Sequence, residues 1–405
     1  MIGVSLKVLL AVSIAGVLAS LFFSFIIFPR IQEPLNLNID PDNCGELAKN
    51  IFQGRGFTYN HSTTPAIDRG PVYPYLVAGV FWLVGQESIQ SVQVFQSLCH
   101  GLTCFLIVLV ARRAWNERAA FIAGILCAIH PMLIWYTSRI WIETVHTLLV
   151  TIVALLTVRL MERASVSRSI VTGLAMGIAI LTKSILILFP LLFGILLLIQ
   201  WKQQGLRAAA ALVLAAACVV TPWTLRNYEV SGHVVPVHTS LGLNLLQGDA
   251  IGDHWADIPF STLEIWQKGN ENTNAVVKGT GYSATDPDGD RLLVCSSLSF
   301  NFSHPIIFLK RIIINGLTFW YLSESPLKSI FLILLQYPLV VLVVIASTRS
   351  WQTTSAQPLI LLIFYFFVCH SLIVGWARYS VPIVPVCVLL ASIVLAKTAG
   401  TQTNR

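Results

Sequence analysis

The chain has 405 residues, of which 55% are hydrophobic and 11% are charged, and its mean hydropathy is +0.74. Soluble globular domains carry about 25% charged residues, so this composition excludes an ordinary soluble protein and predicts an integral membrane protein. The formal net charge of +7 does not indicate nucleic-acid binding, because the basic residues lie in short connections between apolar windows and form no continuous stripe.

Apolar windows of membrane-spanning length recur along the whole chain. A hydrocarbon layer of about 30 Å is crossed by roughly 20 helical residues. We therefore predict one all-α polytopic membrane domain, residues 1–405, with about ten transmembrane helices and interfacial helices in two long loops. The predicted spans are 6–28, 89–112, 118–136, 140–161, 168–183, 184–200, 206–225, 326–347, 357–376 and 379–397.

The connections between these windows predict the topology. Cytoplasmic loops of membrane proteins carry an excess of Lys and Arg. Both termini are then inside, the long loops 30–88 and 226–324 face outward, and 326–397 holds the C-terminal transmembrane helices; a bacterial inner or plasma membrane is the expected location. The Lys/Arg-rich connections are 111–118, 158–168, 200–207 and 347–351.

The two long loops contain short helix patterns. In the first, residues 42–54 predict a surface helix with Asp42 as its cap. A proline-flanked apolar stretch, 70–85, is too short to span and predicts an interfacial helix. In the second loop, the probable acceptor side, 304–322 carries basic residues in its middle and predicts an amphipathic helix on the outer surface.

Charged residues are predicted to gather at the outer ends of the spans. A single Lys or Arg at a helix end is commonly an interfacial anchor. Several cations beside carboxylates on the face that disfavours cations instead predict a deep anionic ligand. Such cations can neutralise a phosphate leaving group while a carboxylate takes the proton of an acceptor, which suits a lipid-linked phosphate donor. The cations are Arg69, Lys183, Arg226 and Arg378, and the carboxylates are Asp40, Asp42, Asp68 and Glu143.

Four stretches of the chain carry a family resemblance. They are "DPDNCGELAKNIFQGRGF" followed by "RGPVYPYLVAGVFWLVG", "HPMLIWYTSRIWIETV", "PWTLRNYEVSGHVVPVHTSLGLNLLQGD" and "ARYSVPIVPV". Through them the chain resembles the multi-spanning C-type glycosyltransferases that use polyprenyl-phosphate sugars, in the branch of protein O-mannosyltransferases and the lipid A aminoarabinose transferase. The third stretch is the most specific.

The resemblance implies a catalytic aspartate early in the first loop. In the family it lies eight residues before an alanine of the surface helix and four before a tyrosine. Counting back from Ala48 gives Asp40, and the tyrosine position is occupied by Cys44. Asp42 is a second candidate for the base.

The resemblance also implies residues that contact the donor phosphate. Arg69 corresponds to the basic residue before the proline-flanked helix, with Gly70 where proline is more usual. Glu143 and Lys183 match an acidic and a basic position of the family. The other implied residues are Asp68, which matches a metal-binding position of some relatives, Tyr73, Arg226, and Arg378 with Tyr379.

These expectations define an inverting transfer of a monosaccharide from a dolichyl- or undecaprenyl-phosphate donor to a protein, lipid or glycan acceptor. No metal site and no cofactor are required, although a divalent cation is compatible if Asp68, His238 and His254 converge. The alternative is a flippase or transporter of a lipid-linked solute. A disulfide between Cys44 and Cys295, the two cysteines predicted outside, is also open.

Overall fold

The computed structural model describes residues 6–34, 37–60, 62, 64–253 and 261–398. Within these ranges the chain is helical, and its single β feature is an isolated bridge between Thr58 and Pro65. The predicted all-α membrane fold is therefore confirmed. The helices are α1 (Leu6–Phe22), α2 (Phe28–Gln32), α3 (Cys44–Phe52), α4 (Val72–Val84), α5 (Ile89–Ala114), α6 (Glu117–Ala128), α7 (Pro131–Trp135), α8 (Glu143–Glu162), α9 (Val166–Thr182), α10 (Phe189–Ser231), α11 (Leu241–Gly252), α12 (Thr262–Val277), α13 (Pro287–Ser303), α14 (Pro305–Thr318), α15 (Pro326–Ser350), α16 (Gln357–Leu372) and α17 (Val384–Thr398).

Six helical stretches in the described ranges are long and apolar enough to cross a membrane, or seven if the bent pair of α13 and α14 is one broken span. The shorter apolar helices include α9 and α16, with 17 and 16 residues. The predicted total of about ten spans therefore stays a prediction. The six stretches are Leu6–Gln32, Ile89–Ala114, Glu143–Glu162, Ser184–Ser231, Pro326–Ser350 and Ala377–Ala396.

The predicted spans 184–200 and 206–225 fall within α10, which reverses direction in its course. Lys202 has non-helical angles (φ 49°, ψ −119°). After this turn the two arms pack closely, because a Cβ on Gly194 would lie 3.3 Å from the Cβ of Ala209. The two arms correspond to the two predicted spans.

The predicted span 118–136 is broken. Helix α6 ends at Ala128 and α7 begins at Pro131. Proline disfavours helical angles in the residue before it, and His130 is extended (φ −67°, ψ 118°). The break matters because the chain after α7 forms one wall of the candidate site.

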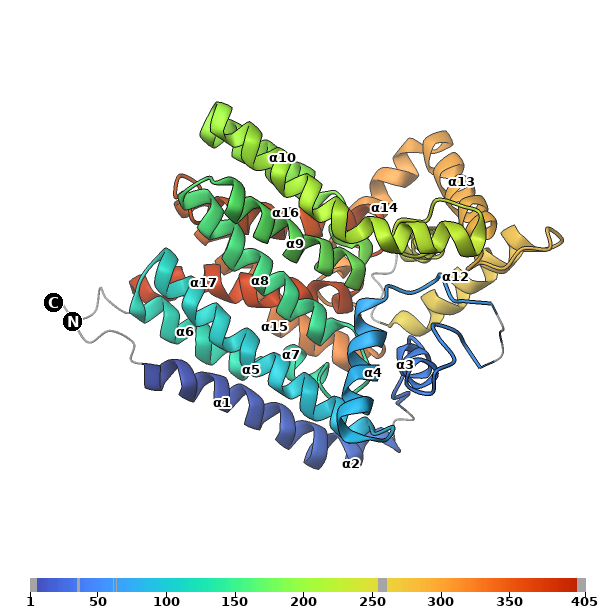
Figure 1. The fold of residues 1–405 in the computed structure, drawn as a ribbon, viewed down its shortest axis with the longest axis horizontal. Coiled ribbons are helices and arrows are strands. Elements are labelled where there is room, and N and C mark those ends of the chain that lie inside the picture. The colour runs from blue at the N-terminus through green and yellow to red at the C-terminus, as the bar shows by residue number, and fades with distance from the viewer. Residues whose placement is uncertain (1–5, 35–36, 61, 63, 254–260, 399–405) are drawn as a thin grey trace.

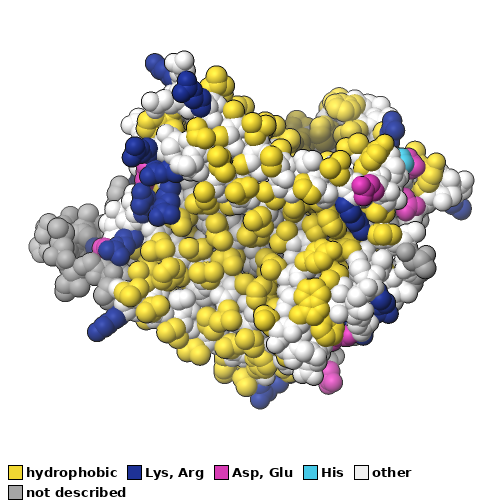
Figure 2. Space-filling view, in the orientation of Figure 1, with side chains coloured by type: hydrophobic (Ala, Val, Ile, Leu, Met, Phe, Trp, Pro, Cys, Tyr) yellow, Lys and Arg dark blue, Asp and Glu magenta, His cyan; other side chains and the backbone are white. Residues whose placement is uncertain are grey.

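The long helices lie side by side along one axis of the molecule (Figure 1). At one end of this axis, on the left of Figure 2, Lys and Arg side chains gather beyond a band of hydrophobic residues. This end joins α5 to α8 through the ion pair of Arg113 with Glu162. The helices of the two long loops, α3, α4 and α12 to α14, lie at the opposite end (Figure 1).

The first loop contains the helices α3 and α4, and the role expected for Asp42 is corrected. Helix α3 buries Leu47, Ala48 and Ile51, and it packs against α4. Asp42 does not cap this helix. The residue at its N-cap is Asn43, which has left-handed angles (φ 55°), and the carboxylate of Asp42 is bound to Arg378 instead.

The second loop folds into α11 to α14, and here the predicted surface helix differs. Helix α14 turns by 113° from α13. Its Arg311 is buried, with Nη1 3.1 Å from Asp249 and Nη2 2.7 Å from Asp253. A buried arginine requires paired carboxylates, so this residue ties α14 to α11 and does not form the polar face of a surface helix.

The cysteines of the two loops are both free thiols. Cys44 is buried in α3, whereas Cys295 is exposed on α13. The disulfide considered between them is not formed.

Candidate active site

Three of the predicted residues meet at one ion-pair cluster. The Arg378 guanidinium donates from Nε to Glu143 Oε1 at 2.6 Å and from Nη1 to Asp42 Oδ1 at 3.1 Å. A second bond joins its Nη2 to the other oxygen of Asp42. Residues from the first loop, α8 and the start of the last span thus converge, as the predicted topology requires.

Lys183 joins the cluster from the end of α9. Its ammonium lies 3.3 Å from Glu143 Oε1, and it stands over the ring of Tyr379 at 4.3 Å from the centroid. Tyr379 is held by its hydroxyl, which donates to Asn244 at 3.2 Å. A cation on an aromatic face is stabilised by the ring quadrupole, so Tyr379 positions Lys183.

Glu143 is the buried centre of the cluster. Its side chain has an exposed fraction of 0%, and its Oε2 has no hydrogen-bond partner. Two cations on the other oxygen supply the pairing that a buried carboxylate requires.

Asp40 lies beside the cluster and is bound differently. Its Oδ2 accepts the backbone N–H of Glu46 at 3.0 Å, while its Oδ1 is buried and has no partner. Gly45 allows this approach, because a Cβ there would lie 2.8 Å from Oδ2. Burial is the main cause that raises the pKa of Asp40 to about 6, with a further contribution from Asp42, against the lowering effect of the backbone N–H groups of α3.

The pKa of Asp42 is shifted the other way. Burial acts to raise it, but the combined charges of Arg378, Arg69 and Lys183 outweigh burial and lower it. Asp42 is thus a permanently charged ion-pair partner, and Asp40 is the carboxylate whose charge changes near neutral pH.

Arg69 lies on the far side of Asp42. It donates from Nε to the Asp42 carbonyl at 2.9 Å and from Nη1 to Asp68 Oδ2 at 3.2 Å. Asp68 also accepts the hydroxyl of Tyr59 at 3.0 Å. Gly70 allows a close approach of the loop to the end of α9, since a Cβ there would lie 2.4 Å from the Leu181 carbonyl oxygen.

Two predicted phosphate ligands, Tyr73 and Arg226, have partners outside the cluster. The Tyr73 hydroxyl donates to Gln96 Oε1 at 2.9 Å, and Gln96 in turn binds the carbonyl oxygens of Thr137 and Arg139. Arg226 donates to the Ala66 carbonyl at 2.6 Å. It also packs on aromatic rings, with its guanidinium 4.6 Å from the Trp223 centroid. In this arrangement Tyr73 braces the first loop, and Arg226 ties that loop to α10.

Sequence reasoning missed residues that line the cluster. Trp141 lies between two guanidinium groups, 3.9 Å from Arg139 and 4.8 Å from Arg378. Arg139 is buried and donates to the Asn38 carbonyl at 3.3 Å, which fixes the chain before Asp40. Arg139 and Trp141 lie in the segment "SRIW" of the quoted stretch "HPMLIWYTSRIWIETV". No spacing rule predicts from this segment that two guanidinium groups contact one tryptophan.

His238 was considered only as a metal ligand, yet it lies at the cluster. Its Nε2 is 3.1 Å from Ser184 Oγ and its Nδ1 is 2.9 Å from Ser240 Oγ. Burial, followed by the charges of Arg69 and Lys183, lowers its pKa to about 4. The ring is neutral at pH 7 and offers one N–H. His254, its predicted partner, lies outside the described residues.

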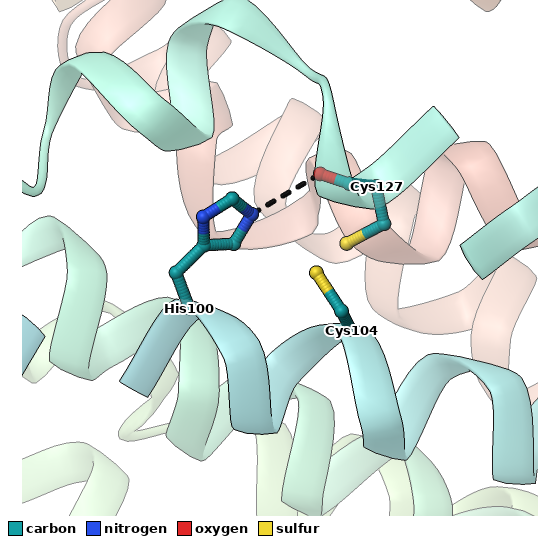
Figure 3. A group of neighbouring side chains, drawn as sticks. All are labelled: His100, Cys104 and Cys127. Carbon is teal, nitrogen blue, oxygen red and sulfur yellow. Dashed lines mark hydrogen bonds between the residues drawn. The ribbon is translucent and has the colours of Figure 1, made fainter. Parts of the chain in front are cut away.

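Within the described ranges, one group of His, Cys, Asp and Glu has metal-site geometry. It is His100, Cys104 and Cys127 (Figure 3), inside the bundle and away from the cluster. The Asp68 carboxylate and the His238 imidazole do not belong to a group of this kind in the described ranges. A cation site near Asp68 therefore stays a prediction.

The comparisons confirm the fold resemblance. Residues 68–224 match the family profile described as dolichyl-phosphate-mannose-protein mannosyltransferase. This segment contains Arg69, Glu143 and Lys183 and ends before Arg378. In a comparison with curated proteins, none matches the chain.

The fold is similar to that of a solved membrane oligosaccharyltransferase. The oligosaccharyltransferase AglB from Archaeoglobus fulgidus, solved with an inhibitory peptide and a dolichol-phosphate, superposes with a TM-score of 0.59 at 14% identity over 97% of this chain and 50% of that one. The same enzyme with Zn and sulfate gives a TM-score of 0.54 at 13% identity, over 96% and 50%. ArnT from Cupriavidus metallidurans bound to undecaprenyl phosphate gives 0.44 at 15% identity, over 98% and 79%. The chain spans about half the length of AglB.

Proposed function

We propose that this chain is a membrane glycosyltransferase that moves a monosaccharide from a polyprenyl-phosphate donor to an acceptor. The observation that carries the proposal is the unpartnered, buried Oδ1 of Asp40 next to the Asp42–Arg378–Glu143–Lys183 cluster. A carboxylate with a pKa of about 6 is matched to proton transfer near neutral pH. The adjacent cations are matched to a phosphate that gains charge as it departs.

The proposed step is a single inverting displacement. The acceptor hydroxyl gives its proton to Asp40 as its oxygen bonds to the anomeric carbon. The bond from that carbon to the phosphate oxygen breaks, and polyprenyl phosphate keeps the electron pair. Lys183, Arg378 and Arg69 meet the new charge, and Asp42 is the less suitable base because both of its oxygens are bonded to Arg378.

The cations are already bonded to carboxylates, and this constrains the proposal. Each ammonium has three donors and each guanidinium five. The ammonium of Lys183 places one of its donors on Glu143, and the charges of Arg69 and Lys183 both lower the pKa of His238 after burial. The phosphate therefore enters on the side of Lys183, Arg69 and His238, where it adds bonds without displacing Asp42.

An apolar groove fits the polyprenyl tail. It has a volume of about 740 Å³ between α14, α15 and α16, and its wall includes Trp320 and Phe367, whose rings stack with centroids 6.4 Å apart. Phe319 directly precedes Trp320 in the chain and stacks on His370. The His370 ring in turn stacks on the Tyr379 ring, with centroids 4.8 Å apart. Packed aromatic rings thus connect the groove to Tyr379, whose ring contacts Lys183. A lipid tail bound in the groove would therefore place its phosphate near the cluster.

The outer face is the proposed side of the reaction. Lys and Arg side chains gather at the end of the bundle opposite the helices of the two long loops (Figures 1 and 2), and such residues favour the cytoplasm. The dolichol-phosphate of the AglB structure and the name of the family matched by residues 68–224 support a phosphate lipid as donor. The proposed host membrane is a bacterial inner or plasma membrane.

The test uses purified protein in lipid nanodiscs with labelled polyprenyl-phosphate sugars of several kinds, hexose and pentose. Sugar-dependent release of polyprenyl phosphate, lost in Asp40→Asn, supports the enzyme; the same assay with and without EDTA decides whether a divalent cation assists. Movement of intact donor between leaflets without release would overturn the proposal in favour of a flippase.

A further inference from the structure

A second cluster of reactive side chains lies in the middle of the helix bundle. His100 and Cys104 are one turn apart on α5, and Cys127 lies near the end of α6 (Figure 3). One ligand atom from each lies within 4.8 Å of the others. His100 has an exposed fraction of 2%, and both thiols have 0%.

The chemistry of these three side chains selects the ligand. Two cysteine sulfurs and an imidazole are the donor set of zinc sites, where a Zn–S bond of about 2.3 Å places sulfur atoms roughly 3.8 Å apart. The present cluster needs a contraction of about an ångström or less to reach that geometry. In an apolar interior the bound ion must also be charge-balanced. Two thiolates carry a charge of −2 and neutral imidazoles add none, so together they balance a divalent ion. With a monovalent ion the same site would keep a net negative charge.

His100 is held in an orientation that suits a ligand. Its Nδ1 is 2.7 Å from Ser20 Oγ, and its Nε2 is 3.1 Å from the carbonyl oxygen of Cys127. The nitrogen at the carbonyl is on the side of the ring that faces the two sulfur atoms (Figure 3). A hydroxyl both donates and accepts, so Ser20 can accept a hydrogen bond from Nδ1–H in the tautomer that leaves the Nε2 lone pair free. Such a hydrogen bond on the far nitrogen is typical of histidines that bind metal.

A fourth donor is available next to the cluster. His130 is buried, and both of its ring nitrogens are without a hydrogen-bond partner. Its backbone N–H donates to the Cys127 carbonyl at 3.3 Å, the same oxygen that His100 contacts. A buried, unpaired imidazole costs free energy unless a ligand satisfies it. His130 lies at the break between α6 and α7, where its backbone is extended.

We propose that His100, Cys104, Cys127 and His130 bind one zinc ion in the centre of the membrane domain. The two thiols lose their protons as the ion binds, which leaves a neutral Zn(Cys)₂(His)₂ unit. The ion would clip α5 to the end of α6, from which the chain continues through α7 to Arg139, Trp141 and Glu143. The site is structural, about half-way along α5, since His100 is 11 residues after Ile89 and 14 before Ala114.

The test measures metal in the full-length protein purified under reducing conditions from cells grown with zinc. We expect one zinc ion per chain and, after exchange with Co²⁺, the thiolate-to-cobalt absorption band of tetrahedral sulfur ligation. The double variant Cys104→Ala/Cys127→Ala should lose both signals. The matched control Cys99→Ala/Cys387→Ala, which also removes two buried thiols, should keep both.

The wild-type protein alone can overturn the proposal if it holds substoichiometric zinc and gives no thiolate band with Co²⁺. Equal zinc retention by the double variant and its control would overturn it as well. His130→Gln should release zinc to a chelator faster than wild type, and an unchanged release rate would remove His130 from the ligand set. Because the readout is metal content, failure here is independent of glycosyl transfer.

Discussion

The guanidinium of Arg378 bonds to the side chain of Glu143, 235 residues earlier in the chain, with Nε 2.6 Å from Oε1. The same guanidinium binds Asp42 of the first loop. One side chain therefore joins the loop, α8 and the last span at the site. The consequence is that charge changes at these positions affect stability and chemistry together, whereas changes at Asp40 separate the two.

Asp40→Asn tests the base. The asparagine keeps an oxygen for the Glu46 N–H but cannot take a proton, so we expect a transfer rate lower by about 10² to 10⁴ and an unchanged melting temperature. The measurement is sugar-dependent release of polyprenyl phosphate beside a thermal melt. Near-normal turnover in Asp40→Asn together with loss in Asp42→Asn would shift the assignment of the base to Asp42.

The pH dependence follows from the raised pKa of Asp40. A base must be ionised, and Asp40 is ionised above its pKa of about 6. We expect kcat/KM to fall by about tenfold per pH unit below 6 and to level off above it. An acidic limb centred near 4, the ordinary range of an aspartate, would contradict the role of burial in tuning this carboxylate.

Glu143→Gln removes the buried partner of two cations. The glutamate is fully buried, and Lys183 and Arg378 both contact its Oε1. Breaking a buried ion pair by removing one partner costs about 3–5 kcal/mol, so we expect a large drop in melting temperature in the same nanodiscs. Glu87→Gln is the control, because Glu87 pairs with Lys49 at a partly exposed site, where a pair contributes about 1 kcal/mol or less. Equal losses in the two variants would contradict the central place of Glu143.

Gly70→Ala tests the close packing of the first loop against the end of α9. A Cβ at Gly70 would lie 2.4 Å from the Leu181 carbonyl oxygen, whereas a Cβ at Gly79, inside α4, would meet nothing within 4 Å. We expect Gly70→Ala to destabilise by about 1–3 kcal/mol through overpacking. Gly79→Ala should be neutral or stabilising by up to about 1 kcal/mol through helix propensity. Similar melting temperatures for the two variants would show that the loop at Gly70 can shift away from the Leu181 carbonyl at little cost, and would contradict the prediction.

Most of the fold could be predicted from the sequence because membrane helices are recognised by their apolar composition, and the Lys and Arg residues of the loops predict their orientation. The same parity argument placed Asp40, Glu143, Lys183 and Arg378 at one end of the bundle, and the structure brings them together. The parity argument could not decide whether Asp40 or Asp42 is the base, because the hydrogen-bond partners of both depend on the left-handed backbone of Asn43. Nor could it find Arg139 and Trp141 or the approach of Cys104 to Cys127, since contacts between helices have no local periodicity.

The apolar groove gives a prediction about donor length. Val344 and Val341 both lie on α15 with an exposed fraction of 56%, but only Val344 lines the groove. Val344→Trp fills the groove and should displace two or three methylene groups of a long tail, each worth about 0.8 kcal/mol, which raises KM for long-chain donors by roughly 15- to 60-fold. Turnover at saturation should not change, because the tail is bound equally in the ground and transition states. Donors with a short prenyl chain, and the matched variant Val341→Trp, should show wild-type KM. An equal KM effect for both variants, or an effect that does not depend on chain length, would mean that the tail lies elsewhere on the membrane face.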